Sequence, residues 1–127
     1  MPSITGLVTG AFHGNVVAEQ NDRFRESWGT DPAVPGRIVA TQGVAALGFA
    51  AAIRIMLIVR VYSAFTEAND PFGTHDFGDF EVEVEGQRVK LYWKIDLYDL
   101  AYEFGSEAPD DPTRTRRLLT LLLPEEW

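Results

Sequence analysis

The chain has 127 residues, of which 46% are apolar and 24% are charged, a composition typical of one globular domain that buries its own core. It contains no cysteine, which excludes disulfides, thiol nucleophiles and thiolate metal sites. Its net charge of −8 argues against a basic surface, so we expect no direct binding to nucleic acid.

The chain shows no targeting or membrane signal. Residues 1–14 are rich in glycine and have no positive residue before their apolar stretch, so we expect a flexible N-terminal segment and not a signal peptide. We expect residues 15–127 to form a single α+β domain. The most apolar stretch, residues 38–65, is interrupted by Arg54 and Arg60 and does not suit a membrane span. We therefore expect a cytoplasmic protein that makes no contact with membranes.

Two helices and a strand are predicted in the first half of the chain. Apolar residues at helical spacing predict a helix over residues 15–28, with Asn15 as its cap. A loop follows, and the β-branched residues of 37–41 predict a short strand. Residues 45–65 are apolar on nearly all sides, which predicts a main helix at the centre of the core.

A β-hairpin is the clearest element of the second half. Apolar and charged residues alternate over residues 77–98, and a type II′ turn is predicted at Gly86-Gln87. An acidic loop over 99–112 and a strand over 115–123 complete the chain. These elements predict an α+β fold, with two helices packed on a mainly antiparallel sheet of about four strands around the central hairpin.

The hairpin has four acidic residues on one face. With Gly86-Gln87 as the turn, Glu85 faces Arg88 and lies on the same side as Glu83. Glu83 in turn faces Lys90. Cross-strand pairs of opposite charge are ordinary sheet stabilisation, so we interpret this face as a solvated set of paired charges and not as a mimic of a phosphate backbone. The acids are Asp79, Glu81, Glu83 and Glu85, and the facing bases are Arg88, Lys90 and Lys94.

Charge is distributed unevenly along the chain. Residues 1–65 hold five arginines against four acids, a net charge of +1, whereas residues 66–127 hold fifteen acids against six bases, a net charge of −9. Such asymmetry predicts an acidic face that attracts a basic partner. The partner-binding residues that we predict lie beyond the paired charges of the hairpin: Asp96, Tyr98, Asp99, Glu103, Glu107, Asp110 and Asp111.

A second candidate site is the loop NDPFGTHDFG at residues 69–78, where Asn69, Asp70, His75 and Asp76 lie close together in sequence. Carboxylate and imidazole groups suit a divalent ion, and a histidine beside an acid suits an oriented base. Asn and Asp side chains also bind the backbone of their own turns, so a purely structural loop, a binding surface and a metal or catalytic site all stay open.

Three arginines near the C-terminus, Arg114, Arg116 and Arg117, suit a phosphate or carboxylate ligand. Because they follow Asp110 and Asp111, we expect internal ion pairs instead. The sequence has no P-loop, Rossmann glycine pattern, GxSxG or HExxH motif. We therefore expect no enzyme activity, no cofactor and no catalytic or metal-binding residues.

Several short motifs extend from about Asn21 to the C-terminus. They are ND and FR at 21–25, ATQGV at 40–44, NDPFGTHDFG at 69–78, YWKIDLYD at 92–99, EFGSEAPDDP at 103–112 and RRLLTLLLPEEW at 116–127. Together these motifs resemble a bacterial family, the domain of unknown function numbered 3768. The resemblance implies a setting on alphaproteobacterial chromosomes, plasmids and integrative elements. Small acidic proteins of mobile elements are often inhibitors of host defence, such as anti-CRISPR or anti-restriction proteins.

Together these observations predict a non-enzymatic acidic interaction module, encoded by a mobile element or phage, that blocks the basic nucleic-acid-binding surface of a host defence complex. Two alternatives remain open: a metal-dependent hydrolase centred on residues 69–78, and a small plasmid regulatory domain.

Overall fold

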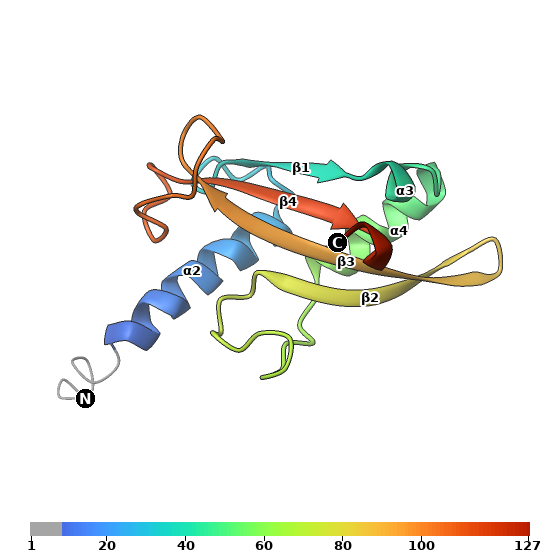
Figure 1. Ribbon diagram of the computed structural model, residues 1–127, viewed down its shortest axis with the longest axis horizontal. Helices are drawn as coiled ribbons and strands as arrows, with labels where there is room; N and C mark the ends of the chain where they lie inside the picture. Colours follow the sequence, from blue (N-terminus) through green and yellow to red (C-terminus); the bar gives the residue numbers. More distant parts are fainter. Residues whose placement is uncertain (1–8) are drawn as a thin grey trace.

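A four-stranded sheet forms the centre of the fold (Figure 1). The computed structural model describes the backbone of residues 9–127 and the side chains from Val16 onward. The strand order is β1-β4-β3-β2, in which β1 and β4 are parallel and the other neighbours are antiparallel. The predicted strands are confirmed, and the bounds are Gly36–Ala40 for β1, Phe77–Val84 for β2, Gln87–Tyr98 for β3 and Arg116–Leu122 for β4.

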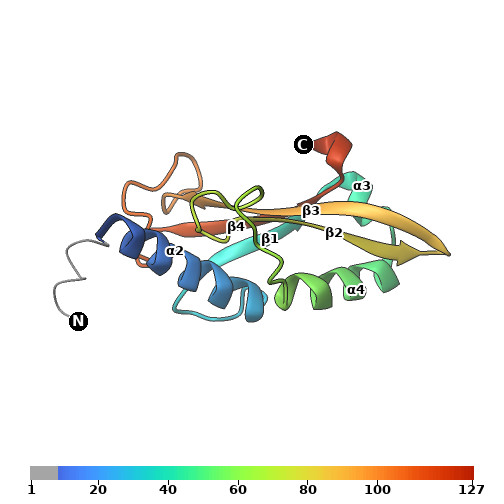
Figure 2. The same ribbon diagram turned by 90° about the horizontal axis from the view of Figure 1, so that it is seen from below.

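Two long helices lie on one face of this sheet, and the C-terminal turn η1 lies on the other side (Figure 2). The predicted α+β fold, with two helices on a mainly antiparallel four-stranded sheet, is therefore confirmed. The helices are α2 (Thr9–Glu26), the short α3 (Gln42–Ala45) and α4 (Phe49–Arg60), and η1 spans Pro124–Glu126. No helix of residues 9–127 is long and apolar enough to cross a membrane.

The first helix begins earlier than the sequence predicts. α2 starts at Thr9, so Asn15 lies inside the helix and does not cap it. Gly10 and Gly14 weaken a helix by about 1 kcal/mol each without ending it, which is why the glycine-rich stretch joins α2. Residues 1–8, which belong to the segment predicted to be flexible, lie outside the residues that the structure describes.

The main helix is shorter than predicted and is not at the centre of the core. Gly48, with a φ of 96°, separates α4 from α3, and α4 ends at Arg60. The side chain of Arg25 donates hydrogen bonds to the carbonyls of Val59 and Tyr62, and so caps the C-terminal end of α4. Only one face of α4 is buried against the sheet, and the opposite face stays exposed.

The hairpin is confirmed, but its turn lies one residue earlier than predicted. Val84 pairs with Gln87, so Glu85 and Gly86 form the two-residue loop. Their φ angles of 51° and 80° are those of a type I′ turn, whose twist matches that of the flanking strands. The register therefore shifts by two residues, which leaves the apolar face unchanged.

The charged face of the hairpin consequently has different pairs from those predicted. Glu83, and not Glu85, faces Arg88. The ion pairs run diagonally, with Arg88 Nη1 3.2 Å from Glu81 Oε1 and Lys90 Nζ 4.0 Å from Asp79 Oδ2. The expected pairing therefore holds for Asp79 and Glu81 only. Among residues 16–127, no ion pair involves Glu83 or Glu85, and Glu85 lies in the turn and is not part of the ladder.

The core lies between the sheet and the two long helices. α2, α4, β3 and β4 each contribute side chains with no exposed surface: Phe24, Ile55, Leu91, Trp93 and Leu119. Trp93 is the largest of the fully buried side chains of this core.

Candidate functional site

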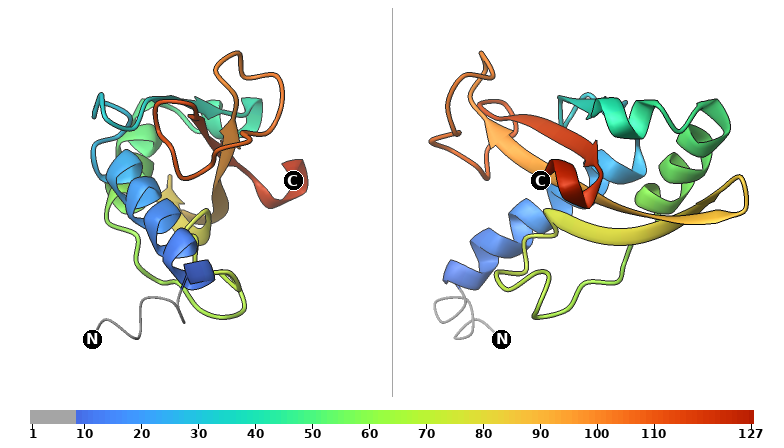
Figure 3. Two further views of the ribbon diagram at one scale, coloured as in Figure 1. Left: turned by 90° about the vertical axis from the view of Figure 1, so that its left-hand side faces the viewer. Right: turned by 45° about the vertical axis from the view of Figure 1, so that its right-hand side comes forward.

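The acidic loop lies at one end of the sheet, and the hairpin turn lies at the opposite end (Figure 3). The loop begins with a tight turn, in which the Asp99 amide donates to the Phe104 carbonyl over 2.8 Å. Its second part is closed by buried Thr115, whose Oγ1 lies 2.7 Å from the Ser106 hydroxyl and donates to the Ala108 carbonyl. We call residues 99–114 the acidic loop.

Two of the predicted partner-binding acids form hydrogen bonds with their own loop. Asp99 Oδ1 accepts hydrogen bonds from the amides of Ala101 and Glu103. Asp111 Oδ1 accepts from both the amide and the hydroxyl of Thr113, and these bonds lower the pKa of Asp111. These two carboxylates therefore shape the acidic loop, as Asx turns commonly do.

Four of the other predicted partner-binding residues are not engaged with the backbone of the loop in this way. Asp96 forms an ion pair with Lys94, whose Nζ lies 2.8 Å from Asp96 Oδ2 on the same face of β3. Tyr98 lies beside Tyr102, with ring centroids 6.4 Å apart. Among the side chains of residues 16–127, no ion pair involves Glu103 or Glu107, and both residues are exposed on the acidic loop.

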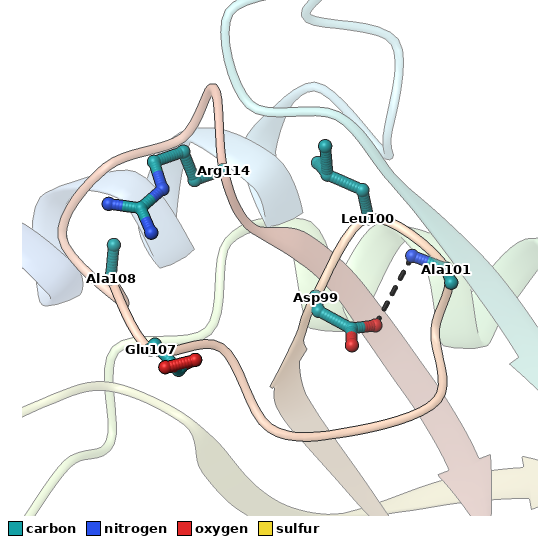
Figure 4. Close-up of a pocket in the computed structure, with 6 residues that line it drawn as sticks. All are labelled: Asp99, Leu100, Ala101, Glu107, Ala108 and Arg114. Atoms are coloured by element: carbon teal, nitrogen blue, oxygen red, sulfur yellow. Dashed lines mark hydrogen bonds between the residues drawn. The ribbon is translucent and has the colours of Figure 1, made fainter.

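A shallow hollow of about 360 Å³ opens in the acidic loop (Figure 4). The carboxylates of Asp99 and Glu107 and the guanidinium of Arg114 are arranged around it, and Leu100 adds an exposed apolar side chain. Ala101 and Ala108 complete its lining. The lining thus has two carboxylates and one guanidinium beside an exposed apolar side chain.

The C-terminal arginines have different partners from one another. The positive charge of Arg114 helps to lower the pKa of Asp111, as expected of an acid near a base, whereas Arg117 binds α2 and not the nearby acids. Arg117 is fully buried and donates from Nε to Asn21 Oδ1 over 2.8 Å and from Nη2 to Gln20 Oε1 over 2.9 Å. Burial lowers the pKa of Arg117 to about 10. The Gln20 amide donates in turn to the carbonyl of Asp110. Arg117 thus joins β4 to α2, and is a structural residue.

The loop at residues 69–78 is organised by Asp70, whose side chain is nearly buried. Its Oδ1 accepts hydrogen bonds from the amides of Thr74 and His75. These bonds hold His75 at a φ of 55°, a left-handed conformation that is costly for a side chain of this size. Asn69 accepts from the Thr66 amide and so fixes the start of the same loop.

His75 lies between two carboxylates. Its Nδ1 is 3.0 Å from Asp22 Oδ1, and its Nε2 is 3.7 Å from Asp70 Oδ2. Because a carboxylate only accepts hydrogen bonds, Nδ1 carries the hydrogen toward Asp22. The ring also stacks on Phe65, with centroids 3.9 Å apart. Both nitrogens therefore face groups of the protein, which holds the ring in one orientation.

Asp22 extends this cluster into the core. It lies 2.5 Å from Nη2 of Arg25, whose guanidinium is buried 4.9 Å from the ring of Trp93 and 5.5 Å from that of Phe65. Such placement over aromatic faces favours the buried positive charge. We call Asp22, Arg25, Asp70 and His75 the His75 cluster.

A hollow of about 350 Å³ adjoins the His75 cluster. It is lined by Asp22, Arg25, Glu26, Arg60, Val61, Tyr62, Ser63, Phe65 and His75.

Asp76, the fourth residue predicted for this loop, is not part of the His75 cluster. Burial of its carboxyl, with Asp70 and Asp96 nearby, raises its pKa, although the residue as a whole is exposed. Its carbonyl accepts from the Ile95 amide and extends the pairing of β2 with β3. Among residues 9–127, no three histidine or acidic side chains are arranged to hold a metal ion.

The sequence indicated Asp70 and His75 as parts of one candidate site, but it did not indicate that Asp22 and Arg25 lie beside them, or that Arg117 binds α2. Asn21-Asp22 and Phe24-Arg25 stand out in the sequence only as motif residues. Asp22 and Arg25 pair with each other three residues apart, but their other partners and those of Arg117 lie 34 to 97 residues away along the chain, so local patterns do not indicate them.

The chain belongs to the family described as Protein of unknown function (DUF3768), whose family model matches residues 40–126. The match begins at the last residue of β1 and includes the acidic loop and residues 69–78, whereas α2 lies outside it. No match was found among curated proteins or among solved structures.

Proposed function

We propose that this chain is a non-enzymatic interaction module that binds a basic protein surface through its acidic loop. The observation that supports this proposal is the composition of the loop's surface. Glu103 and Glu107 have no ion pair within the described residues, and Leu100 and Phe104 are largely exposed beside them. Apolar anchors among charged groups are characteristic of protein interfaces.

The partner that we propose is the nucleic-acid-binding surface of a host defence complex in the cytoplasm, which would make the chain an anti-CRISPR or anti-restriction inhibitor of mobile-element origin. Such a surface presents lysine and arginine to phosphates, and an acidic loop competes for the same side chains. With a net charge of −8, the chain itself should give no mobility shift with duplex DNA near physiological salt.

The test is affinity capture from the native host with matched charge variants. E103K/E107K reverses two charges on the acidic loop, and E83K/E85K reverses two charges at the hairpin end, so the two variants have the same net charge. We expect the wild-type chain and E83K/E85K to recover the same nucleic-acid-binding complex, and E103K/E107K to lose it. Equal recovery by all three chains, or capture of no nucleic-acid-binding protein, would contradict the proposal.

The hydrolase alternative makes a different prediction for residues 69–78. If a divalent-metal-dependent hydrolytic activity is found, and H75A/D76N removes it without lowering the melting temperature, the enzyme hypothesis replaces the one proposed here. Under our proposal the same variant lowers stability and removes no chemical step.

A further inference from the structure

α4 has apolar side chains on two opposite faces. Ala51, Ile55 and Val59 are buried against the rest of the domain. The other face has an unbroken series at four-residue intervals, which we call the α4 stripe. Its members and their exposed fractions are Phe49 (82%), Ile53 (40%), Leu57 (53%) and Val61 (77%). A helix that is apolar on all sides is normally covered on all sides.

The charged residues at the margins of the α4 stripe turn toward their own chain. Arg54 Nη1 donates to the Glu83 carbonyl over 2.7 Å, and Arg60 Nε donates to the Glu26 carbonyl over 2.9 Å. These hydrogen bonds hold the two guanidinium groups against β2 and α2. The apolar side chains between them therefore remain open to a partner.

The α4 stripe has a projection at one end and a hollow at the other. Phe49, its most exposed member, lies at the N-terminal end of α4. A hollow of about 300 Å³, lined by Leu57, Arg60, Val61 and Glu26, lies at the C-terminal end. At a helical rise of about 1.5 Å per residue, Phe49 and Val61 are about 18 Å apart along the axis.

We propose that the α4 stripe is the interface of a symmetric homodimer, in which two α4 helices pack antiparallel. In this arrangement Phe49 of each subunit enters the hollow beside Val61 of the other, and Ile53 of each subunit meets Leu57 of the other. Each of these two contacts occurs twice, because a two-fold axis through the middle of α4 relates the subunits. Such a symmetric use of the same surface defines an isologous interface.

A second copy suits this surface better than an unrelated partner for two further reasons. The projection and the hollow that accepts it are on the same helix, so the surface is complementary to itself. Charge also permits the approach, because α4 contains no acidic residue and its two arginines are bonded to their own chain. The four side chains expose about 400 Å² of apolar surface per subunit, so a dimer buries about 800 Å² before the rim is added, which is at the low end for specific interfaces and corresponds to a weak dimer.

Sedimentation analysis of the full chain tests the proposal. Between about 1 and about 200 µM, we expect the mass to rise from 14.2 kDa toward twice that value. L57E should remain monomeric, and F49A should weaken dimerisation at least about tenfold, because two copies of the Phe49 contact are lost. F72E, at an exposed aromatic residue outside α4, should dimerise like the wild type. A chain that stays at 14.2 kDa throughout, or an L57E variant that dimerises normally, would overturn the proposal.

The antiparallel register has its own test. I53K and L57E should each be monomeric alone, but an equal mixture should dimerise, because the lysine at 53 then faces the glutamate at 57 across the two-fold axis. Circular dichroism melting confirms that each variant is folded. A mixture that stays monomeric while the wild type dimerises would overturn the register, and a different protein bound to the stripe of a monomeric chain would overturn the homodimer. None of these outcomes bears on the acidic loop, so this proposal and the proposed function fail separately.

Discussion

The imidazole of His75 and the carboxylate of Asp22 join α2 to a loop that lies 53 residues further along the chain, with 3.0 Å between Nδ1 and Oδ1. The same carboxylate binds the buried guanidinium of Arg25, which caps α4. One surface histidine is therefore linked, through Asp22, to the packing of both long helices. This arrangement assigns the His75 cluster a role in holding the elements together.

We predict that His75 and Asp22 are energetically coupled. H75A and D22N should each lower the free energy of unfolding by about 1–3 kcal/mol, because each leaves a hydrogen-bonding group without its partner. In a double-mutant cycle, H75A/D22N should lose less than the sum of the single variants, by about 0.5–3 kcal/mol. Urea unfolding of the four chains measures this coupling. As a control, D31N disturbs the pair with Arg23 and the hydrogen bond from the Ala33 amide, neither of which involves His75, so it should be additive with H75A.

The hairpin turn gives a second prediction. G86A places a methyl group at a φ of 80° and should cost about 1–2 kcal/mol through backbone strain alone, since nothing lies within 4 Å of the added carbon. G105A is the matched control, because its surroundings are equally open and its φ is not in the left-handed region. Thermal or urea unfolding should show a loss for G86A and little change for G105A. Equal losses would show that the turn is not type I′.

Glu126 gives a prediction about acid stability. Its carboxylate accepts hydrogen bonds from the hydroxyl of Thr41 and from the amides of Leu123 and Gly43, and these bonds lower its pKa below 4.5. A carboxyl whose pKa is lower in the folded state stabilises the fold fully above the unfolded value and loses this effect as pH falls through the folded value. E126Q should therefore be less stable than the wild type at pH 7, and the difference should shrink between about pH 5 and pH 3.

The control for this measurement is the neighbouring acid. E125Q changes an exposed carboxyl of the same turn for which no hydrogen bond is found among the described residues, and its stability should follow the wild type across the whole range. If the difference in stability between E126Q and the wild type stays constant down to pH 3, the stabilisation does not depend on the negative charge of Glu126, and the prediction is wrong.

Local patterns predicted much of this fold. The alternation of Val82 and Val84 with acidic residues identified the hairpin and its buried face, because period-two burial is a local property. The predicted position of the turn was wrong by one residue, since nothing in the sequence shows that Glu85 adopts a positive φ. A register error of two residues keeps the faces and changes every cross-strand pair, which is why the charged partners were misassigned.

Local patterns could not predict contacts between residues that are far apart in the sequence. The apolar sequence of α4 predicted a central helix, but Ile53 and Leu57 remain exposed because only one face meets the sheet. Arg117 was expected to pair with nearby acids, whereas its partners are amides about 97 residues away. A buried arginine satisfied by Asn and Gln has no periodicity of its own, so only the assembled fold reveals it.

The last prediction concerns which acids attract the partner. Among the described residues, no ion pair involves Glu103 or Glu107 on the acidic loop, or Glu83 or Glu85 on the hairpin. The two pairs of acids therefore differ in where they lie, at opposite ends of the sheet (Figure 3). E103K/E107K should therefore slow association with the basic partner, and E83K/E85K should leave it nearly unchanged.

The dependence on salt separates an electrostatic effect from a loss of folding. The slower association of E103K/E107K should approach the wild-type rate as ionic strength rises from about 0.02 to about 0.5 M, because exposed charges are screened beyond about 10 Å at 0.1 M. E83K/E85K should instead lose a little stability, since the lysine at 83 then faces Arg88 across the strand. Stopped-flow or surface-binding measurements of the association rate for both variants make the comparison once the partner is isolated. If the hairpin variant slows association and the loop variant does not, the partner binds the opposite end of the sheet, and the acidic loop is not the interface.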